Sequence, residues 1–244
     1  MRTALFLAPV LALVACNGGN ANEAAPVQGE AVENVAAPQG QQWTEVVTKT
    51  EQGGYLVGNP NAPVKLVEYG SRTCPACGAF AGQAFEPLME DYVSTGRVSF
   101  EYRDFLIHPQ DLAASLLGRC VSEERYFPML EQMFAAQPEL LPRVQQLSDQ
   151  QIAQLQSMPA PQAAPLWAEA TGYLDFVKQR GLSESQARQC LNNAEMVEEL
   201  VALQQVARED NVSGTPSFFI NGRAVPNTLN WAQLEPQLQA AGAR

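Results

Sequence analysis

The fold is decided by residues 64–80, VKLVEYGSRTCPACGAF. The first part of this stretch alternates as a β-strand does, with Val64 and Glu68 on the same face. The second part begins a helix, because Pro75 stands in the first turn, where its missing N–H costs nothing. Cys74 therefore lies where a strand passes into a helix.

The helix that begins at Pro75 is expected to reach Tyr92, with Pro87 kinking or dividing it. Apolar and polar residues then alternate over residues 98–103, which indicates a second half-buried strand. A strand–helix–strand unit of this kind joins two parallel strands by a right-handed crossover.

The rest of the folded chain is helical and then returns to strands. The pattern is helical from about residue 111 to residue 210. Residues 217–220 and 223–225 indicate two strands, and the Asn-Gly pair between them is a strong hairpin signal. A last helix is expected over residues 230–241. The order βαβ, helices, ββα predicts an α/β core carrying a helical insertion.

The boundaries predicted from this order place the core in residues 43–110 and 206–244 and the insertion in residues 111–205. Residues 16–42 are rich in Gly, Ala, Asn and Gln and are predicted to be a flexible tether. The formal net charge is −11, and no long basic run is present, so nucleic-acid binding is not expected.

Residues 1–15 are predicted to be a signal peptide. Their apolar run is too short to span a bilayer as a helix but fits the apolar region of an export signal. The sequence Leu13-Val14-Ala15-Cys16 resembles the lipobox of bacterial lipoproteins, which implies cleavage before Cys16 and a lipid on that cysteine. An ordinary secretory signal with an incidental cysteine is the alternative.

Cys74 and Cys77 are spaced for redox chemistry. A cysteine at a helix N-terminus is favoured as a thiolate, and the helical turn brings the second cysteine close enough for a disulfide. A structural zinc site would need further ligands, and His108 is the only histidine. A c-type haem would need histidine where Gly78 stands. A plain structural disulfide is the other alternative, and no metal or cofactor is expected.

Three features together resemble the DsbA-like branch of the thioredoxin superfamily. They are the stretch at residues 64–80, the helical insertion, and the sequence GTPSFFING at residues 214–222. The resemblance covers about residues 43–242. It implies a thioredoxin-like core with an inserted helical domain, and an enzyme that exchanges protein dithiols and disulfides.

The resemblance also implies roles for site residues. Cys74 would be the exposed nucleophile and Cys77 the buried resolving cysteine. Thr215-Pro216 would form the cis-proline loop, with the Thr215 backbone pairing with a substrate segment; a generic turn is the alternative. Glu68 would be the family's buried acid, desolvated and raised in pKa; a partly exposed strand-end residue is the alternative.

One position departs from the strongest oxidants of that branch, which have histidine where this chain has Ala76. A cationic partner for the Cys74 thiolate is thereby lost, so a smaller pKa depression is expected. His108 is expected to be a residue at the start of a helix or on the surface.

The five cysteines leave two beyond the redox pair and Cys16. Cys120 and Cys190 fall on apolar helix faces. Some DsbA-like proteins carry a second disulfide in the insertion, which favours a structural Cys120–Cys190 bond. Two small buried thiols are the alternative.

Three functions are compatible with this sequence. The favoured one is donation of the Cys74–Cys77 disulfide to exported proteins that contain cysteine, with a membrane or periplasmic redox partner. An isomerase or reductase is the second, because Thr215 resembles the residue of isomerase-type relatives. A lipid-anchored binding or chaperone-like module with an incidental C-x-x-C is the third. The expected location is the periplasm-facing cell envelope, at the outer membrane, since Asn17 is not the usual inner-membrane retention residue.

Overall fold

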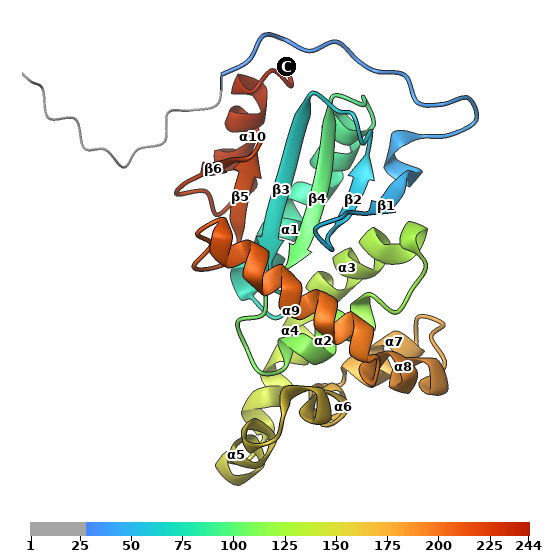
Figure 1. The fold of residues 1–244 in the computed structure, drawn as a ribbon, viewed down its shortest axis with the longest axis vertical. Helices are drawn as coiled ribbons and strands as arrows, with labels where there is room; N and C mark the ends of the chain where they lie inside the picture. Colours follow the sequence, from blue (N-terminus) through green and yellow to red (C-terminus); the bar gives the residue numbers. More distant parts are fainter. Residues whose placement is uncertain (1–27) are drawn as a thin grey trace, which may run out of the picture.

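The computed structural model describes residues 28–244 and is built around a six-stranded sheet (Figure 1). The strand order is β1-β2-β4-β3-β5-β6. The strands are β1 (Val47–Lys49), β2 (Tyr55–Gly58), β3 (Val64–Gly70), β4 (Val98–Asp104), β5 (Ser217–Ile220) and β6 (Arg223–Val225). β3 and β4 are parallel, and the other neighbouring pairs are antiparallel.

The predicted strand–helix–strand unit is confirmed, because α1 (Pro75–Pro87) connects β3 to the parallel strand β4. Pro87 is the last residue of α1, and the chain continues as a single π-helical stretch, Leu88–Val93. The prediction that Pro87 divides the helix is therefore also confirmed. The hairpin of β5 and β6 turns at Asn221 and Gly222, both with positive φ.

β1 and β2 were not predicted from the sequence. They form an antiparallel pair that extends the sheet beyond β4. They have only three and four residues, and a run this short shows no periodicity that separates a strand from a loop. Their place follows from pairing with β4, which lies more than 40 residues further along the chain.

The insertion is helical, as predicted, and most of it lies beyond the end of the sheet where β3 and β4 terminate, while its helices α3 and α9 also pack against the sheet (Figure 1). Its helices are α2 (Asp111–Gly118), α3 (Tyr126–Ala135), α4 (Gln137–Leu140), α5 (Asp149–Ser157), α6 (Ala160–Thr171), α7 (Tyr173–Lys178), α8 (Glu184–Leu191) and α9 (Ala194–Glu209). Capping boxes of Ser148 with Gln151 and Ser183 with Gln186 start α5 and α8. No helix within residues 28–244 is both long and apolar enough to cross a membrane.

The two faces of the sheet are covered differently. Leu66 and Phe100 belong to a large apolar core with side chains of α1, α3 and α10 (Trp231–Ala240). Tyr69, on the other face of β3, packs with Ala207 of α9. The face of β3 that carries Glu68 is thus the one buried beneath α1.

Residues 28–43 are here called the N-terminal strap. They include residues 28–42 of the predicted flexible tether, which bind to the folded domain; residues 16–27 of that tether lie outside the described residues. Gly29 and Val32 donate backbone hydrogen bonds to the carbonyls of Ala240 and Gly242, both at 2.9 Å. The Trp43 indole N–H donates to the Val35 carbonyl at 2.7 Å. The composition of this segment indicates disorder, but its backbone groups find partners at the C-terminus and in the loop before β4.

The strap depends on glycines that let backbone approach backbone. A Cβ on Gly96, whose φ is +71°, would lie 2.4 Å from the Val35 carbonyl oxygen and 2.5 Å from the Trp43 indole nitrogen. We therefore expect Gly96→Ala to lower the free energy of unfolding by about 1–3 kcal/mol, measured by urea denaturation. Gly82→Ala is the control, since nothing lies within 4 Å of its Cβ and alanine favours the helix. Equal stability of both variants would contradict the prediction.

Candidate active site

Cys74 and Cys77 lie together at the N-terminus of α1, as the sequence predicts. Cys74 is the residue that caps the helix, and its carbonyl accepts the first helical hydrogen bond, from Gly78 at 3.1 Å. Both cysteines are free thiols in this structure. Cys77 is completely buried, whereas Cys74 keeps 5% of its surface exposed.

The two thiols have pKa values shifted in opposite directions. Hydrogen bonding with Cys77 is the largest cause that lowers the pKa of Cys74 from 9.0 to about 5. Burial opposes this shift, while hydrogen bonds from Thr215 and from the backbone of Cys77 and Ala76 add to it. Burial, followed by the hydrogen bond with Cys74 and the charge of Glu68, raises the pKa of Cys77 far above its ordinary value.

The peptide bond between Thr215 and Pro216 is cis and stands directly before β5. The Thr215 carbonyl accepts a hydrogen bond from the Cys74 thiol at 3.5 Å. Cys74 is 5% exposed, so it is less exposed than the family resemblance implies. The redox pair and the cis-proline loop, 141 residues apart in the chain, form one site.

Glu68 lies on β3 beneath the redox pair and is 1% exposed. Its two carboxyl oxygens have no hydrogen-bond partner. Burial, followed by the negative charge of Cys74, raises the pKa of Glu68 to about 8. The carboxyl is therefore mostly protonated at neutral pH and can serve as a proton donor.

A polar network beside the redox pair was not found from the sequence. The buried Asp111 carboxylate accepts hydrogen bonds from the hydroxyls of Ser71 and Thr73 and from the backbone N–H of His108 at 2.8 Å. The His108 side chain is 41% exposed and reaches the Thr73 hydroxyl, 2.8 Å from its Nδ1. His108 stands before a helix, as predicted, but also contacts the residue preceding Cys74.

A buried ion cluster supports the same loop and was also missed. Asp104, at the end of β4, accepts hydrogen bonds from Arg72 Nε and Arg119 Nε, each at 2.8 Å. Arg72 and Asp104 are 0% and 1% exposed. Burial would raise the pKa of Asp104, but the two arginines outweigh it and hold that pKa well below its usual range. Arg72 is thereby fixed two residues before Cys74.

An apolar hollow opens beside Cys74. It is lined by residues of α1, α3 and the turn that follows α4, among them Pro75, Ala79, Phe134, Leu141 and Pro142. At its edge Gln137 donates hydrogen bonds from Nε2 to the carbonyls of Arg72 and Cys74, both at 3.0 Å. A Cβ on Gly78 would lie 2.1 Å from the Gln137 side chain, so the glycine after C-P-A-C is needed for this contact.

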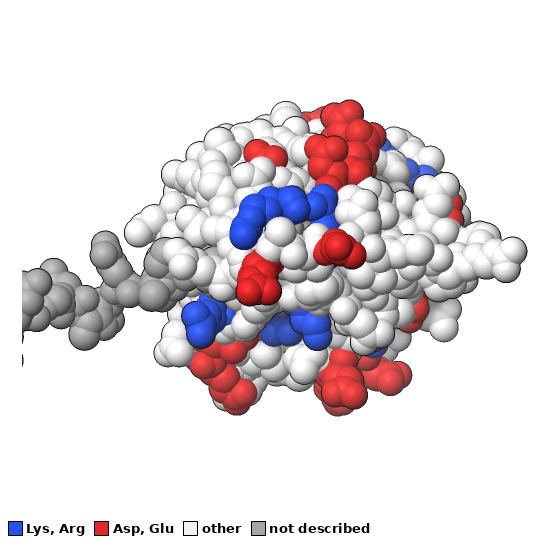
Figure 2. Space-filling view, turned by 90° about the horizontal axis from the view of Figure 1, so that it is seen from above, with Lys and Arg blue, Asp and Glu red and all other residues white. Residues whose placement is uncertain are grey.

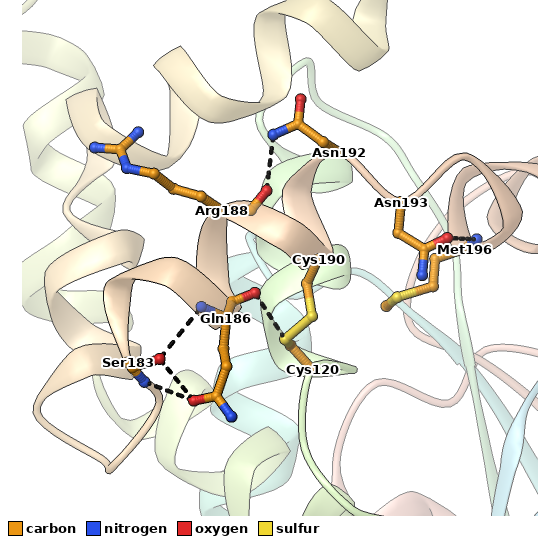
Figure 3. Close-up of a disulfide and its surroundings, with 8 residues drawn as sticks. All are labelled: Cys120, Ser183, Gln186, Arg188, Cys190, Asn192, Asn193 and Met196. Carbon is orange, nitrogen blue, oxygen red and sulfur yellow. Dashed lines mark hydrogen bonds between the residues drawn. A yellow bond between two sulfur atoms is a disulfide. The ribbon is translucent and has the colours of Figure 1, made fainter.

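Cys120 and Cys190 form a disulfide in the structure, with their Cα atoms 5.9 Å apart (Figure 3). It joins the residue after Arg119 to α8 and lies beside the Ser183–Gln186 capping box. Both cysteines are half-buried rather than fully buried in helix faces. The predicted lipidation site, Cys16, and the predicted signal peptide lie outside the described residues.

Comparison with known proteins agrees with this geometry. The family described as Thioredoxin matches residues 49–240. A putative protein-disulfide oxidoreductase of Rickettsia typhi is 28% identical over 189 residues, which cover 75% of this chain and 60% of that protein. The chain thus spans about 60% of the length of the first curated relatives that it matches.

Solved structures agree as well. A protein-disulfide isomerase from Novosphingobium aromaticivorans is 31% identical, with a TM-score of 0.73 over 76% of this chain and 95% of that chain. The alpha-DsbA1 of Wolbachia pipientis is 20% identical, with a TM-score of 0.62 over 78% of this chain and 92% of that one. The chain therefore belongs to the thioredoxin family and has the fold of its DsbA-like members.

Proposed function

We propose that the chain is a protein thiol–disulfide oxidoreductase that donates the Cys74–Cys77 disulfide to exported proteins containing cysteine. The observation that carries this proposal is the opposite shift of the two thiol pKa values at one helix N-terminus. A low pKa at Cys74 stabilises the reduced form as a thiolate, and this makes the disulfide ready to accept electrons.

The reaction runs in two exchanges. A substrate thiolate attacks Cys74 Sγ, the Cys74–Cys77 bond breaks, and Cys77 leaves as a thiolate within a mixed disulfide. Since its pKa is high, Cys77 takes a proton, which the protonated Glu68 carboxyl supplies. A second substrate thiolate then attacks the substrate sulfur and releases Cys74 as a stable thiolate. Two electrons pass from the substrate to the enzyme, and the substrate gains a disulfide.

The surroundings of Cys74 suit an extended peptide. The Thr215 backbone stands beside the thiol at the start of β5, where a substrate strand can pair with it. The apolar hollow next to Pro75 would accept an apolar side chain of that peptide. Renewed turnover requires an oxidant for the reduced pair, and we propose a membrane or periplasmic redox partner for this step.

An isomerase is the second candidate. It is favoured by the structural match to a protein named protein-disulfide isomerase, and by Thr215 before the cis-proline. An isomerase works from its reduced form on wrongly paired disulfides, whereas an oxidase works from its oxidised form on thiols.

The two candidates are separated by two assays with the full chain. We expect the oxidised protein to convert a peptide with two thiols to its disulfide in stoichiometric amounts. We expect the reduced protein to rescue scrambled ribonuclease only weakly. The reverse pattern would assign an isomerase, and no exchange in either assay would leave a binding or chaperone-like module.

We further propose that the chain is a lipoprotein anchored through Cys16 in the cell envelope, facing the periplasm. The strap begins at the end of the domain opposite the end of β3, so this anchor would leave Cys74 facing away from the membrane (Figure 1). Residues 17–27 can span at most about 40 Å. At the strap end, basic side chains are interspersed with acidic ones (Figure 2), so attachment would rest on the lipid.

The anchor is tested by feeding cells a tagged fatty acid and isolating the protein from wild type and Cys16→Ala. Label in the wild type and none in the variant supports it. A wild-type protein recovered unlabelled, with a mature N-terminus other than Cys16, would refute it. The same fractions show whether the protein lies in the outer membrane, as the absence of Asp at position 17 suggests.

A further inference from the structure

Two buried polar side chains beneath the redox pair lack partners and stand next to each other in the sheet. The hydroxyl of Tyr102 and both carboxyl oxygens of Glu68 have no hydrogen-bond partner. Glu68 on β3 and Tyr102 on β4 are register partners in the parallel pair, so their side chains lie on the same face. Tyr102 is 0% exposed.

The absence of a side chain at Gly70 lets these two groups approach the same point. A Cβ on Gly70 would lie 2.8 Å from the Tyr102 hydroxyl oxygen and 3.0 Å from Glu68 Oε1. The Tyr102 hydroxyl oxygen and Glu68 Oε1 both lie close to this Cβ position, so the two oxygens are less than about 6 Å apart. A small movement of either side chain, or one water molecule, would join them.

Of the two described residues in register with Glu68 on the neighbouring strands, only Tyr102 is polar. On the other side, β5 places Phe218 in register with Glu68. From α1, the facing titratable groups are Cys74 and Cys77, which are negative or neutral. Arg72 lies 5.7 Å from the centre of the Tyr102 ring, but it is bound to Asp104.

The aromatic contact of Tyr102 does not need its hydroxyl. The ring meets Phe134 edge-on, and phenylalanine could make the same contact. A buried hydroxyl without a partner costs free energy, so phenylalanine at this position would be the more stable choice. The hydroxyl is therefore expected to have a partner in another state of the reaction.

We propose that Tyr102 is a positioning residue for proton transfer, whose hydroxyl donates a hydrogen bond to the Glu68 carboxylate after Glu68 has protonated Cys77. The proton passes from the Glu68 carboxyl to the Cys77 thiolate, and Tyr102 keeps its own proton throughout. A carboxylate in this apolar setting needs such a donor, because burial disfavours its charge. A side chain at position 70 would collide with both groups, so the glycine is needed for that contact.

This inference rests on the proposed disulfide exchange but can be tested apart from it. In the reduced full chain, NMR titration of the Glu68 carboxyl should show its pKa rising by about one unit in Tyr102→Phe. Tyr173→Phe is the matched control, since it loses a buried hydroxyl that contacts the Arg72 carbonyl at 3.4 Å instead. An unchanged Glu68 titration in Tyr102→Phe would overturn the proposal.

Kinetics provide the second readout. In rapid mixing of the oxidised chain with a thiol peptide near pH 7, Tyr102→Phe should release Cys77 about tenfold more slowly. Alkylation of Cys74 should keep its wild-type pH profile, and Tyr102→Phe should have no further effect in a Glu68→Gln background. Additive effects of the two substitutions would overturn the proposal. If the wild type shows no disulfide exchange with the peptide, the proposed function is refuted. The NMR titration of Glu68 would still show whether Tyr102 donates a hydrogen bond to its carboxylate.

Discussion

Replacement of Cys74 by serine is expected to lower the rate of peptide dithiol oxidation at least about a thousandfold, to the uncatalysed rate. The variant has no sulfur at the helix N-terminus, so it forms no disulfide with Cys77 and no mixed disulfide with a substrate. The remaining thiol cannot substitute, because Cys77 is completely buried and its pKa is raised. Stopped-flow oxidation of a two-cysteine peptide measures this loss.

The paired variant Cys77→Ser should behave differently. It keeps the Cys74 thiol but has no second thiol to resolve a mixed disulfide. When it is mixed with a peptide that carries a disulfide, Cys74 should attack one sulfur, the other sulfur should leave as a thiolate, and the mixed disulfide should accumulate, visible on non-reducing gels. The double variant Cys120→Ala, Cys190→Ala is the control, since it removes the other disulfide and leaves the redox pair intact. Oxidation activity that survives in Cys74→Ser would show that the C-P-A-C is not the catalytic group.

Asp104→Asn is expected to cause the largest loss of stability, about 3–5 kcal/mol in the free energy of unfolding. The substitution keeps the shape of the side chain but leaves the buried Arg72 without a counter-charge, and leaves Arg119 with only the partly exposed Glu199, 3.7 Å from its Nη1. Urea denaturation measures the loss. Glu139→Gln is the control, because its ion pair with Arg143 is exposed and such pairs contribute little.

The same carboxylate makes stability depend on pH. The folded-state pKa of Asp104 is lowered below the unfolded value of about 3.9, so its contribution is complete above that value and is lost as pH falls further. Unfolding of the wild type below about pH 4 should therefore show an acid-sensitive component that Asp104→Asn lacks. If Asp104→Asn lowers the free energy of unfolding by less than about 1 kcal/mol at pH 7, the ion pairs of Asp104 with Arg72 and Arg119 do not stabilise the fold as described.

The redox site was predictable because its signals are local in the chain. Pro75 starts a helix and Cys74 and Cys77 lie one turn apart, so three or four residues define the chemistry. The paired strands β3 and β4 were predictable for the same reason, since each is seven residues long and shows alternation. Thr215-Pro216 is an ordinary turn sequence by itself and gained meaning only through the family resemblance.

The groups that surround the site were not predictable, since their partners lie far away in the chain. Arg72 and its partner Asp104 are 32 residues apart in the chain. The sequence alone does not show whether an arginine is buried or exposed. His108 meets Thr73 across 35 residues. Tyr102 lies in a strand that was predicted, but only the strand register shows that it flanks Glu68.

The N-terminal strap was not predicted for a different reason. Its composition is that of a flexible tether, yet its backbone pairs with the C-terminal residues and the loop before β4. Composition reports how much apolar surface a segment can bury, not whether its backbone groups find partners. Gly29, Gly96 and Gly242 make those close approaches possible, and their meaning is visible only in the folded chain.

The reduction potential of the Cys74–Cys77 pair, measured by glutathione titration, decides whether the chain is a disulfide donor. The folded pKa of Cys74, about 5, lies below its ordinary 9.0, so the reduced protein is stabilised as a thiolate. This stabilisation is complete above about pH 9, is partly retained at pH 7, and is lost as pH falls through about 5. The depression is smaller than in DsbA, where the pKa is about 3.5. We predict a reduction potential between that of DsbA, about −120 mV, and that of thioredoxin, about −270 mV. The Ala76→His variant should have a less negative potential than the wild type. A value below about −270 mV would contradict a disulfide donor.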